Sequence, residues 1–225
     1  MPEISGPTVS ARVADIAAAV RAIAFDATAL VLASPHGPER GIYAGRRGDL
    51  DGFGRSVVSI ESTNADDLAG ELGRTWHAAT LGSSLDHGIV TPLALGLMPG
   101  TQVVSVSVVD QDDGRRLAEV VAAVAAHRST KIAFVASGHL GGALTERAPV
   151  PLDPAAVELD DDVVAGLSED AGVLDRRAGD LADVGRSCSA GVLVAFGTLF
   201  AGTAARVTAY ARPFGVGYVV ATVDA

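Results

Sequence analysis

The chain has 225 residues, 48% of them hydrophobic, and a formal net charge of −10. This length and apolar content suffice for one large domain with a sizeable core, while the acidic balance disfavours binding to a nucleic-acid backbone. No apolar run reaches the roughly 20 residues that a membrane helix needs, so we expect neither a nucleic acid nor a membrane as partner. The single cysteine, Cys188, excludes an internal disulfide and fits a reducing compartment, which predicts a cytoplasmic protein.

The first half of the chain predicts alternating helices and strands. Residues 10–25 have apolar side chains at helical spacing and predict an amphipathic helix. Residues 28–34 form a short apolar run that stops at "PHGP", which predicts a buried strand ending in a loop. The stretch 41–54, rich in glycine and aspartate, is typical of a strand edge and a turn, and 56–62 predicts an exposed strand. Residues 64–82 predict a helix with acidic residues in its first turn.

The second half continues the alternation. It predicts strands over 101–109 and 131–137, helices over 114–128, 153–170, 172–185 and 190–202, and two strands within 205–225 joined at "PFGVG". No internal repeat, low-complexity linker or domain boundary interrupts the sequence. The pattern predicts a single α/β domain over residues 1–225 with a largely covered sheet.

Three of the five histidines fall in predicted loops. His36 and His139 come just after predicted strands, and His87 lies between a predicted helix and an apolar segment. In α/β sheets the loops at the carboxyl ends of strands carry functional groups, so these three are candidates for a site. His77 and His127 fall on predicted helices, where a structural role is expected.

The pair Asp86 and His87, and the single cysteine Cys188, each allow two opposite interpretations. Asp86 and His87 form either an acid/base pair in which the aspartate orients the imidazole, or a turn in which Asp86 bonds backbone amides and His87 packs against a strand. Cys188 precedes an apolar helix, where a thiol has a lowered pKa and becomes reactive or metal-binding. Its alternative is a small buried hydrophobic residue.

Four segments, in the same order along the chain, resemble the class III extradiol ring-cleavage dioxygenases. The segments are "SPHG", "LDHGIVTPL", "VASGHLGGALTERAPVPLDP" and "ARPFGVGYVV". This LigB-like superfamily also contains the Memo-like proteins, and the chain looks most like its short actinobacterial members. The resemblance implies one α/β domain with a mixed, mostly buried sheet and helices on both faces. It also implies that copies of the chain assemble into a homo-oligomer.

The chemistry that the resemblance implies is ring opening of a catechol-like aromatic. Family enzymes bind Fe(II) through two histidines and a carboxylate, and the open face of the metal takes the catechol and O₂. A separate histidine acts as acid and base. His36 of "SPHG" falls on a family metal ligand, and Asp86 and His87 fall on the family's "DHG" pocket motif.

Other positions depart from the family pattern. The family's N-terminal strand, with its first metal-binding histidine, precedes a segment like "PEISGP", which here follows Met1, so that strand is expected to be missing. The family's catalytic histidine maps onto Gly142, and a family carboxylate maps onto Ser187. His139, three positions before Gly142, is a candidate replacement. Memo-like relatives use a cysteine near the position of Cys188.

Three functional hypotheses follow from the resemblance. The first is an iron-dependent extradiol dioxygenase in which His36 is a metal ligand, His87 and His139 are acid/base groups and Asp86 orients His87. The second is a member of the same fold that has lost ring cleavage and its metal and binds a small molecule or a protein in the old pocket. Because required side chains are absent, the second is favoured on mechanism. The third is a Memo-like metal or redox site built on Cys188 and His36.

Overall fold

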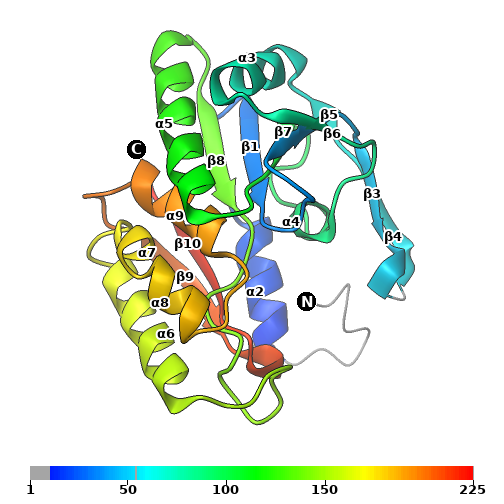
Figure 1. Ribbon diagram of the computed structural model, residues 1–225. Coiled ribbons are helices and arrows are strands. Elements are labelled where there is room, and N and C mark those ends of the chain that lie inside the picture. The colour runs from blue at the N-terminus through cyan, green and yellow to red at the C-terminus, as the bar shows by residue number, and fades with distance from the viewer. Residues whose placement is uncertain (1–10, 54, 225) are drawn as a thin grey trace.

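Buried parallel strands form the centre of the molecule, as the apolar runs in the sequence predict (Figure 1). The structure is a computed structural model and describes residues 11–53 and 55–224. The main sheet has the order β6-β2-β7-β1-β8, with β5 paired to β7. Its strands are β1 (Ala29–Ser34), β2 (Gly41–Tyr43), β5 (Thr63–Asn64), β6 (Ala79–Leu81), β7 (Gln102–Ser107) and β8 (Ile132–Ala136). All these pairs are parallel except β2 with β7, so the sheet is mixed.

Helices cover both faces of this sheet because successive side chains of each buried strand point to opposite faces. Leu30 and Leu32 of β1 pack with α2 (Ala11–Arg21) and α4 (His87–Ala94). Val31 and Ala33 pack on the opposite face with α3 (Asp66–Trp76), α5 (Gln111–His127) and α9 (Ala190–Leu199). The predicted class, an α/β fold with a mixed, mostly buried sheet and helices on both faces, is confirmed.

The C-terminal strands form a second, separate sheet. β9 (Arg206–Ala211) and β10 (Tyr218–Thr222) pair antiparallel, joined through the short 3₁₀ turn η2 (Pro213–Gly215), as the "PFGVG" segment predicts. The pair packs on α6 (Pro154–Leu167), α7 (Val173–Arg176) and α8 (Ala178–Asp183). Helix α2 contacts both β9 and β10 and therefore holds the two sheets together.

A hairpin of β3 (Arg47–Leu50) and β4 (Arg55–Glu61), with the 3₁₀ turn η1 (Asp51–Phe53) between them, projects from the side of the main sheet (Figure 1). Its second strand, β4, corresponds to the strand predicted over 56–62. The hairpin brings Phe53 to the end of the sheet where the candidate residues lie.

Three predictions of local structure need correction. The helix predicted over 64–82 ends at Trp76, because His77 adopts a left-handed conformation (φ 53°) that stops it, and 79–81 is strand β6. His87 was predicted in a loop, but it is the first residue of α4. The helix predicted over 172–185 is divided into α7 and α8 at Arg177. The "PEISGP" segment and the strand expected to precede it lie outside the described residues.

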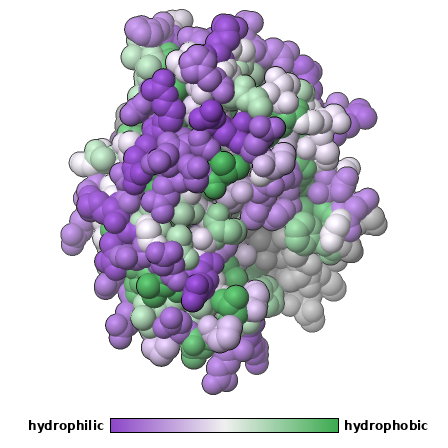
Figure 2. Space-filling view, in the orientation of Figure 1, coloured by the Kyte–Doolittle hydropathy of each residue, from purple (hydrophilic) through white to green (hydrophobic). Residues whose placement is uncertain are grey.

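The described surface is mostly hydrophilic on the face that Figure 2 shows, in keeping with the acidic composition. Within the part of the chain that the structure describes, no helix has the length and apolarity needed to cross a bilayer.

Candidate functional site

Two neighbouring parallel strands, β1 and β8, end side by side and carry two of the candidate histidines. Ala33 lies opposite Ala136 in their ladder, and the Ser137 N–H donates to the Ala33 carbonyl at 2.9 Å. Ser34 and Ser137 therefore occupy equivalent positions, and His36 and His139 each follow two residues later. The two loops that carry these histidines therefore lie at the same edge of the sheet.

Asp86 is the most connected of the candidate residues. As N-cap of α4 its carboxylate accepts hydrogen bonds from the backbone N–H groups of Gly88 (2.7 Å) and Ile89 (3.2 Å). It also accepts from Ser34 Oγ (2.7 Å) and from the Tyr43 hydroxyl (2.6 Å). The predicted bonding of Asp86 to backbone amides is thus confirmed, and the same carboxylate fixes the start of the helix that carries His87.

His36 and His87 stack on each other. Their ring centroids lie 3.9 Å apart at 31°, and Phe53 meets His87 edge-on at 4.8 Å. Gly88 permits this contact, because a Cβ at that position would lie 2.3 Å from Ser34 Oγ and 3.1 Å from His36 Cδ2. The result is a small aromatic surface at the carboxyl end of β1.

Both stacked imidazoles favour the neutral form. Burial, followed by the charge of His87 and to a smaller extent that of His139, lowers the pKa of His36 to about 4, against the opposing effect of the Asp86 carboxylate. Burial also lowers the pKa of His87, against the opposing effect of the Asp86 carboxylate. At neutral pH each ring therefore offers one N–H donor and one acceptor nitrogen.

His139 and Cys188 form a second pair, beside β8. The Cys188 sulfur lies 3.3 Å from His139 Nε2, and His139 Nδ1 lies 3.1 Å from the Leu140 carbonyl, to which it donates. Ser189 Oγ accepts from the His139 N–H at 3.0 Å, and Ser187 Oγ donates to the His139 carbonyl at 2.8 Å. The imidazole is thus held with Nε2 directed at the thiol.

This contact favours charge separation between sulfur and ring. The hydrogen bond with His139 lowers the pKa of the Cys188 thiol, despite the opposing effect of burial. Burial is the largest single effect and would lower the pKa of His139. The hydrogen bond and charge of Cys188, together with backbone hydrogen bonds to Leu140 and Gly141, outweigh burial and raise that pKa. Cys188 is exposed, so the alternative of a small buried hydrophobic residue is wrong.

We expect His139→Ala to slow alkylation of Cys188 by iodoacetamide at pH 7, because the thiol loses the imidazole that stabilises its thiolate. The loss is roughly tenfold for each unit by which the thiol pKa rises. The pH dependence of the alkylation rate measures this, with His127→Ala, an exposed histidine on α5, as the control. An unchanged pH midpoint in His139→Ala would contradict the assignment.

The structure brings the five predicted side chains together as two groups at adjacent strand ends. Asp86, His87 and His36 form one group, and His139 and Cys188 form the other. Among residues 11–53 and 55–224, no three His, Cys, Asp or Glu side chains are placed to hold one metal ion. The acid/base roles predicted for His87 and His139 and the metal roles predicted for His36 and Cys188 stay predictions.

The structure bears on the hypothesis that His139 takes the place of the histidine that the resemblance assigns to position 142. A Cβ built on Gly142 would lie 3.7 Å from His139 Cε1 and 3.2 Å from the Arg186 carbonyl oxygen. The His139 imidazole thus lies close to the position that a side chain at 142 would enter. Ser187, where the resemblance implies a carboxylate, instead supports the His139 backbone.

Sequence reasoning missed Ser34, Tyr43 and Asp160. Ser34 and Tyr43 hold the Asp86 carboxylate from other strands. Asp160 is fully buried in α6 and accepts from the Gly141 N–H at 2.6 Å, which fixes the loop after His139. An aspartate on the apolar face of a predicted helix was the available signal for Asp160.

Comparisons with known proteins bear on the fold alone. No protein-family model matches the chain, and no curated protein matches its sequence. Among solved structures, the chain is similar to the crystal structure of the uncharacterized protein JW3007 from Escherichia coli K12. The TM-score is 0.54 with 16% identity, over 92% of this chain and 89% of that one. At this identity the likeness supports a shared architecture and no activity.

Proposed function

We propose that this protein is a LigB-like homologue that binds a small catechol-like aromatic at the carboxyl ends of β1 and β8 and does not cleave its ring. The observation that carries the proposal is the stacked, neutral pair His36 and His87 with Phe53 at its edge. An aromatic ring gains about 0.5–1.5 kcal/mol per favourable contact with such a surface. Within the described residues, the ring nitrogens of His36 and His87 have no hydrogen-bond partner, so they remain able to bond two adjacent hydroxyls.

Iron-dependent ring cleavage needs more than these residues supply. A facial iron site takes three protein ligands, and the described part of the chain contains no such group. The donors that the resemblance assigns to positions 142 and 187 are replaced by Gly142 and Ser187. We therefore propose that this site binds the aromatic ligand without iron. We also propose that the protein is cytoplasmic, because its only cysteine is a free, exposed thiol.

A second candidate function rests on the contact between Cys188 and His139. A thiolate and an imidazole are ligands that copper and zinc prefer, as the Memo-like hypothesis requires, and the two atoms lie 3.3 Å apart. The partner predicted for Cys188 was His36, but the structure pairs Cys188 with His139 instead. Copper or zinc that co-purifies with the protein and is lost in Cys188→Ser would support this candidate.

We expect catechol to bind the wild-type protein in calorimetric titrations without oxygen uptake, even after Fe(II) is added. Phe53→Ala is expected to weaken binding by about 2- to 13-fold, which corresponds to the loss of one aromatic contact. His87→Ala should weaken it further, because a stacking face and a hydroxyl partner are both removed.

Phe214→Ala is the matched control, because Phe214 is exposed to a similar degree (51%) as Phe53 (46%). Absence of catechol binding, or equal weakening of binding by Phe214→Ala, would contradict the proposed binding site. Stoichiometric iron with oxygen uptake and a yellow ring-opened product would contradict the proposal that the protein does not cleave the ring. Light scattering on the same samples tests the predicted homo-oligomer.

A further inference from the structure

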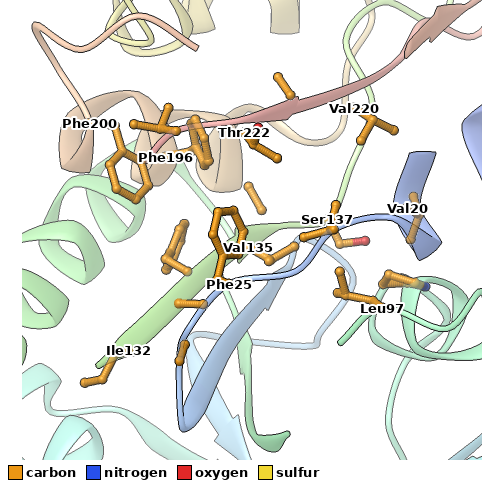
Figure 3. Close-up of a pocket in the computed structure, with 18 of the residues that line it drawn as sticks. Val20, Phe25, Leu97, Ile132, Val135, Ser137, Phe196, Phe200, Val220 and Thr222 are labelled. Carbon is orange, nitrogen blue, oxygen red and sulfur yellow. The ribbon is translucent and has the colours of Figure 1, made fainter. Parts of the chain in front are cut away.

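A cavity of about 790 Å³ lies between β8 and β10 and extends to the carboxyl end of β8 (Figure 3). Ser137 and Gly138, the two residues directly before His139, belong to its wall, as does Tyr218 at the start of β10. The other side chains that Figure 3 labels are apolar, apart from Thr222. The space beside this strand end therefore favours a neutral molecule with apolar surface over a charged one.

Cys188 and His139 have the arrangement that a nucleophile and its base require. Since His139 Nδ1 donates to the Leu140 carbonyl at 3.1 Å, Nε2 is the acceptor nitrogen of the neutral ring, and it lies 3.3 Å from the Cys188 sulfur. The two serines that flank the cysteine, Ser187 and Ser189, each bond the His139 backbone. The thiol and its base are thus fixed in place, and Cys188 is exposed to an incoming molecule.

The aromatic surface around His87 lies at the neighbouring strand end. β1 and β8 are adjacent in the sheet, so their ends are separated by about 4.8 Å, which is close to the width of one aromatic ring. Ser137 Oγ donates to the Gly88 carbonyl at 2.6 Å, which ties the first turn of α4 to the end of β8. An aromatic molecule on this surface therefore lies beside the segment that leads into His139.

An ortho-quinone, the two-electron oxidised form of a catechol, suits both groups of residues. It is neutral and planar, so it stacks as a catechol does. Its two oxygens accept hydrogen bonds, and the neutral rings of His36 and His87 each offer one N–H donor. Unlike those of the catechol, its ring carbons are electrophilic and react with a thiolate, the nucleophilic form of cysteine.

We propose that Cys188 covalently captures ortho-quinones that bind at the ends of β1 and β8. This inference rests on the proposed binding of catechol-like aromatics and adds a reaction to it. The quinone reaches the protein already oxidised, so the site itself needs no oxidant.

The step is an addition in which every atom of both reactants is kept. His139 Nε2 takes the proton of the thiol, and an electron pair of the sulfur forms a bond to a ring carbon. The ring electrons move onto the quinone oxygens. One oxygen then takes the proton from His139, and the other takes the proton displaced from the attacked carbon. The product is a catechol joined to Cys188 by a thioether.

Methyl-ortho-benzoquinone, prepared from methylcatechol with periodate and freed of the periodate, tests the proposal by intact mass and by the rate of adduct formation. We expect a mass gain of one quinone per chain, located at Cys188 and not at Lys131, the only lysine of the chain. Because the quinone binds before it reacts, the rate should reach a plateau as the quinone concentration rises. Methylcatechol kept under nitrogen should slow the reaction by competition, and Cys188→Ser should give no adduct.

Phe53→Ala separates capture within the site from the ordinary reactivity of an exposed thiol. It removes one aromatic contact and leaves Cys188 and His139 intact, so the rate at low quinone concentration should fall by about 2- to 13-fold. The rate with iodoacetamide should stay unchanged. Phe214→Ala, the matched control, should change neither rate, whereas His139→Ala should lower both because the base is lost.

The outcomes distinguish this proposal from the catechol binding on which it rests. A rate that rises linearly with quinone concentration and is equal in wild type and Phe53→Ala would overturn capture within the site, even where calorimetry shows that catechol binds. An adduct at Lys131 in place of Cys188 would overturn it as well. Absence of catechol binding in the calorimetric titration would instead overturn the proposed function, and capture within the site with it.

Discussion

Asp160→Ala is expected to lower the free energy of unfolding by about 3–5 kcal/mol, the usual cost of removing one partner from a buried charged network. Asp160 is fully buried and accepts hydrogen bonds from the Gly141 N–H and the Tyr210 hydroxyl. Arg212 Nε lies 3.8 Å from the carboxylate. The substitution leaves the Gly141 N–H and the Tyr210 hydroxyl without their acceptor, between the C-terminal sheet and the loop that follows His139, whereas Arg212 keeps its ion pair with Asp161.

Urea denaturation measures this loss, and Asp160→Asn is the matched control because the amide keeps the shape and one acceptor oxygen.

Burial raises the pKa of Asp160, although the Tyr210 hydroxyl, the Gly141 N–H and Arg212 oppose the effect. A group whose pKa is raised on folding stabilises the fold below its unfolded pKa, and this contribution is lost as the pH rises through the folded value. The wild-type protein should therefore gain stability relative to Asp160→Asn as the pH falls toward 4. A loss below 1 kcal/mol in Asp160→Ala would contradict the network.

Asp86→Ala is expected to destabilise the protein by about 2–4 kcal/mol. The estimate combines about 1 kcal/mol for a helix cap with about 1 kcal/mol for each hydroxyl left without its acceptor. Those hydroxyls belong to Ser34 and Tyr43. Because the start of α4 loses its anchor, the stack between His36 and His87 should loosen too, and catechol binding should weaken.

Asp110→Ala is the control, since Asp110 caps α5 through a single exposed bond to the Asp113 N–H at 2.8 Å. It should cost about 1 kcal/mol, as an isolated cap does. Thermal denaturation compares the two variants, and NMR of the imidazole protons reports the ring stack. Equal losses in both would show that Asp86 acts only as a helix cap.

The sequence predicted the elements whose signal is local. Buried apolar runs predicted β1, β7 and β8, and helical spacing predicted α2 and α5. Predictions of secondary structure failed where a single residue ends an element earlier than the sequence pattern indicates. His77 ends α3 through a left-handed conformation that composition does not reveal. Strand β6 has three residues, too few for periodicity to distinguish it from the end of a helix.

The sequence predicted which histidines belong to the candidate site, but it did not predict the residues that hold those histidines in place. His36 and His139 follow apolar strands, and parallel strands end at one edge, so their proximity follows from topology. Tyr43 bonds Asp86 from 43 positions away, and Cys188 reaches His139 across 49 positions. Such contacts depend on how strands and loops pack in three dimensions, which no spacing within the chain encodes.

Cys188 also gives experimental access to this face of the molecule. It is the sole cysteine of the chain, and it lies exposed beside the His139 ring. A maleimide fluorophore would attach there and nowhere else, without any engineered substitution. Quenching of its emission would show when a molecule arrives at the ends of β1 and β8. The label would thus monitor occupancy even before the natural ligand is identified.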